Sequence, residues 1–153
     1  MTDLLRLDKQ LCFALYAASR AVTQAYGPVL AALGLTYPQY LVLLVLWERD
    51  GASVKQLGER LQLDSGTLTP LLKRMESQRL VSRVRATDDE RVVHVNLTAA
   101  GRALERRAIA MPKALFCKAR LSVTEIGRLR GQLTTLTRSL RSDASPTKEK
   151  TRR

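Results

Sequence analysis

The chain has 153 residues, with 26 lysines and arginines against 14 aspartates and glutamates, so its formal net charge is +12. This length suits one domain with a real hydrophobic core, and the charge favours a polyanionic partner such as nucleic acid or an anionic membrane surface. Aromatic residues make up only 5% of the chain, too few for the stacking platforms of single-strand binders, so duplex DNA is favoured. No apolar run has transmembrane length, and Asp3 and Asp8 stand where a signal peptide would be basic; we therefore expect a cytoplasmic protein.

The first third of the chain predicts two helices. From residue 7 to about residue 33, apolar residues recur at every third or fourth position, which is the spacing of a long amphipathic helix. Thr36 and Gln39 then have the spacing of a capping box, which opens a helix. That second helix, from residue 37 to about residue 49, is apolar on nearly every side, so we expect it to be the buried centre of the fold.

Two short helices are predicted next. Ser53 and Gln56 form another capping-box pattern for a helix that ends near residue 61, and Asp64 can cap a helix over residues 64–76. Such a pair, joined by a tight turn, is a helix-turn-helix, whose second helix can lie in the major groove. The candidate DNA contacts on its polar face are Ser65, Thr67, Thr69, Pro70, Lys73 and Arg74. Hydroxyls and cations are ordinary on any solvated helix, so this helix alone does not establish DNA binding. The neighbouring elements must decide whether it binds DNA.

A β-hairpin follows the second short helix. Residues 80–85 and 91–96 alternate apolar and polar side chains and are rich in valine, and a polar turn separates them. Beside a helix-turn-helix, such a hairpin can serve as a wing that lays cations on phosphate or in the minor groove. Its candidate DNA contacts are Arg83, Asp89 and Arg91. The chain's one histidine, His94, is expected on the strand surface rather than as a ligand or base.

The last third predicts two further helices, one from Thr98 to about residue 121 with a bend near Pro112, and one opened by Ser122. The predicted fold is mainly α, an α+β winged helix-turn-helix with six helices and a β-hairpin wing. Its long terminal helices carry apolar stripes that pairing of two chains would bury, so we expect a homodimer; packing within one chain is the alternative. The predicted parts are dimerisation helices at 4–35 and 98–141, a winged helix-turn-helix at 36–97 and a disordered basic tail at 142–153.

Several local sequences carry a family resemblance. They are DSGTLTPLLKRME at 64–76, DDER at 88–91 and LTAAG at 97–101. With the order of elements over residues 4–141, they resemble the MarR family of dimeric winged-helix repressors. LDKQLCFALY at 7–16, Tyr26 and LTYPQY at 35–40 are similar to one branch, the organic-hydroperoxide-sensing repressors (OhrR).

The resemblance implies roles for two cysteines and three tyrosines. Cys12 would be the peroxide-reactive residue, and Tyr26 and Tyr37 of the partner subunit would hydrogen-bond to its sulfur, with Tyr16 as a further thiolate-stabilising residue. Cys117 looks like the resolving cysteine of two-cysteine members, which implies an intersubunit Cys12–Cys117 disulfide in the oxidised state. The chemistry is coherent, because a thiolate reduces a peroxide and becomes a sulfenic acid that a second thiol condenses to a disulfide. The simpler interpretation is that both cysteines only pack, as most free cysteines do.

The expected function is therefore a redox-controlled transcriptional repressor and not an enzyme. A reduced dimer would bind roughly palindromic double-stranded operator DNA, and organic hydroperoxide as effector would release it. The main alternative is a MarR-type repressor regulated by a small aromatic ligand without cysteine redox chemistry. A peroxide-consuming enzyme and an architectural DNA-binding protein without a switch are two further candidates. No cofactor or membrane association is expected. No metal site is expected either, since the two cysteines lie too far apart in sequence for a zinc motif.

Overall fold

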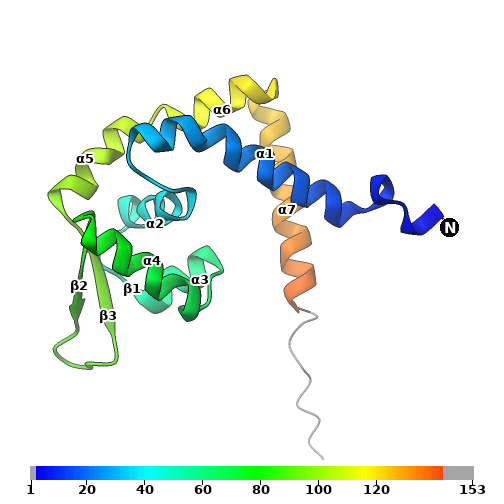
Figure 1. Ribbon diagram of the computed structural model, residues 1–153. Helices are drawn as coiled ribbons and strands as arrows, with labels where there is room; N and C mark the ends of the chain where they lie inside the picture. The colour runs from blue at the N-terminus through cyan, green and yellow to red at the C-terminus, as the bar shows by residue number, and fades with distance from the viewer. Residues whose placement is uncertain (1–2, 143–153) are drawn as a thin grey trace, which may run out of the picture. The chain divides into compact units, whose positions relative to one another are not determined.

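The computed structural model describes residues 3–142, except for the side chains of residues 113–116, and it is mainly helical with a small antiparallel sheet (Figure 1). Two 3-10 turns, η1 (Asp3–Leu5) and η2 (Leu7–Lys9), precede the first helix. The α-helices are α1 (Leu11–Ala32), α2 (Tyr37–Glu48), α3 (Val54–Leu61), α4 (Ser65–Ser77), α5 (Ala99–Ala108), α6 (Met111–Ala119) and α7 (Val123–Ser142). The strands are β1 (Ala52–Ser53), β2 (Val81–Arg85) and β3 (Val93–Leu97). The chain divides into two compact units, Met1–Met111 and Pro112–Arg153.

Helix α2 is the centre of the first unit, as its composition predicts. It contacts α1, α3, α4 and α5, and its Val42, Leu43 and Leu46 side chains are completely buried. Because an aliphatic side chain gains about 1.5–3 kcal/mol on full burial, this helix supplies much of the apolar burial that holds its neighbours. No single helix in the described part of the chain is long and apolar enough to cross a membrane, and the one pair that passes by length and composition, α1 with α2, is bent by 77°.

The predicted helix-turn-helix and wing are both confirmed. At the start of α3, the Ser53 hydroxyl oxygen accepts the Gln56 N–H at 3.2 Å, and the Gln56 side-chain oxygen accepts the Ser53 N–H at 2.8 Å. The hairpin forms a three-stranded sheet in the order β1-β3-β2. The two-residue strand β1 was not predicted, since two residues show no alternation; it pairs Ala52 with Val95 and so joins the start of α3 to the wing.

Two boundaries differ from the prediction. Helix α1 begins at Leu11 rather than at residue 7, because Gln10 has an extended backbone after the 3-10 turn. The helix predicted from residue 99 to about 121 is two helices, so the described residues contain seven α-helices rather than six. Pro112 is the second residue of α6; since it lacks an N–H, the first turn of a new helix suits it better than a helix interior. Beyond Ser142, the last residue of α7, the predicted tail lies outside the described residues.

His94 is half-buried rather than on the open strand surface. Its Nδ1 lies 2.9 Å from the Gly51 carbonyl oxygen, and because a carbonyl can only accept, this nitrogen carries the proton. His94 therefore helps to hold the turn before β1 against β3, which is a structural role.

Gly101 gives a test of the packing between α2, α5 and the wing. Its carbonyl oxygen accepts the Trp47 indole N–H at 3.0 Å, and a Cβ at this position would collide with the Leu80 carbonyl oxygen. We expect Gly101→Ala to lower the free energy of unfolding by about 1–3 kcal/mol in urea titrations, as overpacking does. On an exposed helix the same change would raise it by about 1 kcal/mol. Ala100→Gly at the exposed neighbour is the control and should cost about 1 kcal/mol; a stabilised Gly101→Ala protein would contradict the packing.

Candidate functional site

Helix α4 presents most of the predicted DNA contacts on one exposed face. Its buried stripe consists of Leu68, Leu71, Leu72 and Met75. On the other side Ser65, Thr67, Pro70, Lys73 and Arg74 are exposed, and Thr69 is half-buried. This face therefore offers hydroxyls near the helix start and two cations further along, the arrangement that suits base edges and phosphates.

Asp64 caps α4 and fixes the start of that face. One of its carboxylate oxygens accepts the Thr67 N–H at 2.8 Å, and the other accepts the Thr67 hydroxyl at 3.1 Å. These bonds, the backbone one first, hold the pKa of Asp64 below its usual value. The Thr67 hydroxyl proton is thus committed to Asp64, so toward an outside partner this hydroxyl acts as an acceptor.

Pro70 lies inside α4 without ending it. It is the sixth residue of the helix and is exposed, and the helix continues to Ser77. Because proline has no N–H, the Gly66 carbonyl loses its intrahelical partner. The exposed first turn of α4 therefore carries a backbone acceptor in addition to its hydroxyls.

Arg83 ties the wing to the end of α4. Its side-chain Nε and one terminal nitrogen lie 2.9 and 2.6 Å from one carboxylate oxygen of Glu76. The backbone N–H of Arg83 donates to the other oxygen at 3.1 Å. The Arg83 hydrogen bonds hold the pKa of Glu76 below its usual range. The sequence did not single out Glu76, because a pair between a helix and a strand has no fixed spacing. The structure thus gives Arg83 a positioning contact, and its DNA contact stays a prediction.

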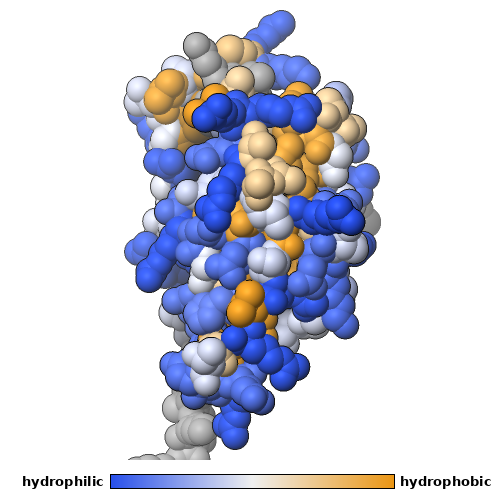
Figure 2. Space-filling view, turned by 90° about the vertical axis from the view of Figure 1, so that its left-hand side faces the viewer, coloured by the Kyte–Doolittle hydropathy of each residue, from blue (hydrophilic) through white to orange (hydrophobic). Residues whose placement is uncertain are grey.

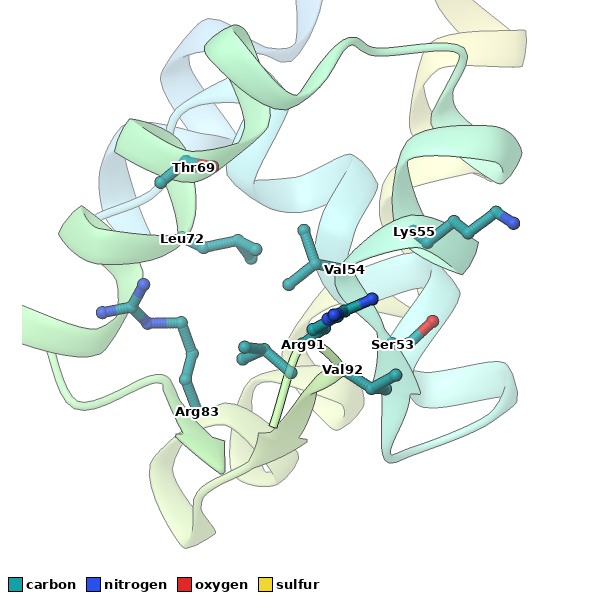
Figure 3. Close-up of a pocket in the computed structure, with 9 residues that line it drawn as sticks. Ser53, Val54, Lys55, Thr69, Leu72, Arg83, Arg91 and Val92 are labelled. Carbon is teal, nitrogen blue, oxygen red and sulfur yellow. The ribbon is translucent and has the colours of Figure 1, made fainter. Parts of the chain in front are cut away.

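A groove of about 360 Å³ separates α3, α4 and the wing. Figure 3 shows Thr69 and Leu72 of α4 on one side and Val54 of α3 on the other, with Arg83 and Arg91 reaching in from the wing. Thr69, Arg83 and Arg91, predicted from separate elements, therefore meet around one cavity.

The wing loop holds the remaining predicted contact. Asp89 is exposed, and its carboxylate accepts the Arg91 N–H at 3.0 Å, which shapes the loop that carries the Arg91 side chain. The side of the molecule that carries the wing is mostly hydrophilic, with smaller apolar patches (Figure 2). Such a surface is compatible with a charged, hydrated partner.

Cys12 lies far from α4 in the sequence, as the second residue of α1, and its side chain is exposed. Tyr16, one turn further along, is also exposed; its hydroxyl accepts from Arg20 at 3.2 Å, and the Arg20 guanidinium lies 5.6 Å from its ring centre.

Tyr26 and Tyr37 form an aromatic cluster with Tyr40. The ring centres are 5.5 Å apart for Tyr26 and Tyr37 and 5.7 Å apart for Tyr26 and Tyr40. Burial, reinforced by Tyr40 and Tyr37, raises the pKa of Tyr26 to about 12. This phenol therefore stays protonated at any physiological pH and remains a hydrogen-bond donor.

The cysteine and this cluster cannot meet within one chain. Cys12 and Tyr26 lie fourteen residues apart on α1, and at about 1.5 Å per residue their backbones are separated by roughly 21 Å. A sulfur–phenol contact therefore requires a second copy of the chain. Cys117 is exposed on α6 in the second unit, and its pairing with Cys12 stays a prediction.

No group of three or more His, Cys, Asp or Glu side chains in the described part of the chain could hold a metal ion.

The chain is similar to known transcriptional regulators over most of its length. The family model described as "Transcriptional regulator SarA/Rot" matches residues 24–107. The "Organic hydroperoxide resistance transcriptional regulator" of Bacillus subtilis (strain 168) is 47% identical over 138 residues, which cover 90% of this chain and 94% of that protein. The chain belongs to the MarR family of transcriptional regulators, in its organic-hydroperoxide-regulator branch.

Solved structures of AbfR from Staphylococcus epidermidis agree with this membership. Reduced AbfR bound to DNA has a TM-score of 0.78 at 35% identity and covers 92% of this chain and 96% of that one. Disulfide-formed AbfR has a TM-score of 0.59 at 35% identity, covering 94% and 96%. The family confirms the predicted winged helix-turn-helix, and it consists of regulators, so the expectation that the chain is no enzyme is also confirmed.

The Glu76–Arg83 pair predicts a pH-dependent loss of stability. We expect Arg83→Met to lower the free energy of unfolding by about 1 kcal/mol at neutral pH, because a partly exposed, charge-assisted ion pair is lost. Since the folded-state pKa of Glu76 is lowered, this contribution is present above the ordinary glutamate range near pH 4 and disappears as the pH falls through the folded value.

Urea titrations of wild type and Arg83→Met at neutral pH and in acid, below the folded-state pKa of Glu76, measure this loss. Arg85→Met, at an exposed position of the same strand, is the control. An Arg83→Met deficit of the same size in acid and at neutral pH would contradict the pairing.

Proposed function

We propose that the chain is a homodimeric transcriptional repressor that binds roughly palindromic operator DNA and is inactivated when an organic hydroperoxide oxidises Cys12. The supporting observation is that a regulator fold carries an exposed Cys12 at the start of α1 and a half-buried tyrosine cluster about 21 Å along the same helix. Acting on operator DNA, the protein would work in the cytoplasm.

The exposed apolar surface supports the dimer. Leu4, Leu5, Leu7 and Leu11 are each at least 60% exposed at the start of the chain. In the second unit, the stripe of α7 leaves Leu129, Leu133 and Leu140 exposed. Exposed apolar side chains gathered on helices favour association, so segments 4–35 and 98–141 are the proposed dimerisation regions. Antiparallel pairing of two α1 helices would bring Cys12 of each chain to Tyr26 and Tyr37 of the other.

In this proposal, α4 and the wing bind the operator DNA. Two α4 helices would enter successive major grooves about 34 Å apart. Ser65, Thr67, Thr69 and Pro70 would then meet base edges or thymine methyls. Lys73, Arg74 and Arg91 would bind phosphate or the minor groove.

The redox step needs only the peroxide and two thiols. The Cys12 thiolate attacks the terminal peroxide oxygen; the O–O bond breaks, and the alkoxide takes a proton from solvent and leaves as the alcohol. Cys12 is thereby oxidised to a sulfenic acid while the peroxide is reduced. The Cys117 thiol of the partner subunit then attacks the sulfenic sulfur, water leaves, and an intersubunit disulfide forms. Phenol donors such as Tyr26 would stabilise the starting thiolate.

Disulfide formation would release the DNA by moving the dimerisation helices. A dimer reads two half-sites only at one spacing, so a change in the distance between the two α4 helices is enough to lose affinity. The cysteine therefore does not need to touch the DNA.

Cys12→Ser tests the sensor. We expect the reduced variant to bind operator as wild type does, because Cys12 lies outside α4 and the wing, and to stay bound after stoichiometric organic hydroperoxide. Gel-shift titration before and after peroxide measures both. The matched variant Cys117→Ser should form the sulfenic acid without an intersubunit crosslink on a non-reducing gel. Normal release from the Cys12→Ser variant would refute the sensor.

Arg74→Met tests the DNA face. Removal of one phosphate-binding cation should weaken operator and random DNA alike and reduce the slope of log affinity against log salt by about one unit. Arg106→Met, at an exposed position of α5, is the control. An unchanged slope for Arg74→Met would place the DNA elsewhere.

The groove beside α4 favours a second candidate function. Its two arginines and its apolar wall of Val54 and Leu72 would suit a small aromatic acid. A ligand that shifts operator affinity in a Cys12→Ser, Cys117→Ser double variant would support regulation without cysteine chemistry.

A further inference from the structure

Gln39 is the one polar side chain among the described residues that is buried, with 3% of its surface exposed. It joins two helices. Its side-chain oxygen accepts the Thr36 N–H at 2.9 Å, and its side-chain nitrogen donates to the Gln78 side-chain oxygen at 2.8 Å. Thr36 is the N-cap of α2, and Gln78 is the C-cap of α4. One amide therefore ties the start of α2 to the end of the proposed recognition helix.

The chemistry of the partners fixes the polarity of this link. A backbone N–H can only donate, so the Gln39 oxygen must face Thr36 and its nitrogen must face Gln78. The Gln78 amide in turn must present its oxygen. Because Gln39 is 3% exposed, loss of its partner would leave a largely buried amide poorly solvated, so the link resists separation of α2 and α4.

Both ends of the link are functionally placed. Gln39 stands between Tyr37 and Tyr40, whose rings belong to the cluster proposed to bind the Cys12 sulfur. Gln78 is followed by Arg79, whose φ of 58° turns the chain out of α4, and by Leu80, just before wing strand β2. A displacement of the first turn of α2 would therefore move the segment that connects α4 to wing strand β2.

We propose that the Gln39–Gln78 hydrogen bond transmits the redox state of Cys12 from the tyrosine cluster to α4. When oxidation removes the thiolate from Tyr37, the first turn of α2 shifts, and Gln39 pulls the C-terminal end of α4 with it. Gln39 and Gln78 are positioning residues, because neither belongs to the tyrosine cluster or to the predicted DNA contacts. This inference rests on the proposed function.

Gln78 is exposed and can be changed without opening the core. Gln78→Met keeps the shape and removes the acceptor, whereas Gln78→Glu keeps an acceptor. Ser77→Ala is the control, since the Ser77 hydroxyl bonds only within α4, to the Arg74 carbonyl at 2.8 Å. The readout is the ratio of operator dissociation constants for the oxidised and reduced protein at matched salt. The added charge of Gln78→Glu affects both states and cancels in this ratio.

We expect the ratio in Gln78→Met to fall about fivefold below wild type, the effect of one hydrogen bond. Thiol titration should show Cys12 oxidised at the wild-type rate. Gln78→Glu and Ser77→Ala should keep the wild-type ratio. A wild-type ratio in Gln78→Met, or an equal loss in Gln78→Glu, would overturn the inference.

A second measurement needs no peroxide and separates this inference from the proposed function. In the reduced protein, Tyr37→Phe and Gln78→Met should be non-additive in operator affinity, because both act on the same link. Additive effects would overturn the coupling. A wild-type protein that oxidises but keeps its operator would instead refute the proposed release, and this cycle would still decide whether the link couples α2 to α4.

Discussion

The burial of α2 is the constraint on which the rest of the first unit depends. A helix that is apolar on nearly every side must be covered on every side, and α1, α3, α4 and α5 provide that cover. As a result the helix that begins at Tyr37, beside the tyrosine cluster, also packs against α4, the proposed recognition helix. The same burial brings Trp47 to Gly101 and so fixes α5 against α2. The proposed sensing cluster and the proposed DNA-binding helix therefore share one core.

Helix α1 imposes a second constraint. Its length holds Cys12 and Tyr26 about 21 Å apart, so one chain cannot assemble a thiolate with its phenol donors. If the phenols stabilise the thiolate, the sensor exists only in a dimer, and whatever alters the sensor acts directly on the dimer contact. In that case the thiolate site and the dimer interface are the same surface. A cysteine remote from α4 could therefore control the spacing of the two α4 helices.

The sequence predicted those features that depend on neighbours in the chain. The capping boxes at Ser53 and Ser122 could be recognised because their partners stand three residues away, and both are present in the structure. The wing was visible in its alternation. Contacts between elements had no such signal: the Glu76–Arg83 pair, the Gln39–Gln78 bond and strand β1 appear only when the core has folded. The roles of Cys12 and Tyr26 came from family resemblance, since an isolated cysteine more often only packs.

The central claim is that oxidation of the cysteine controls DNA binding. Its most direct test measures operator affinity of the reduced wild-type protein before and after one equivalent of organic hydroperoxide, with a non-reducing gel of the same samples. We predict tight binding before peroxide and loss of binding after it. A crosslinked dimer should appear in step with that loss, and a thiol reductant should restore both. Unchanged operator affinity in protein whose Cys12 is fully oxidised would contradict the account.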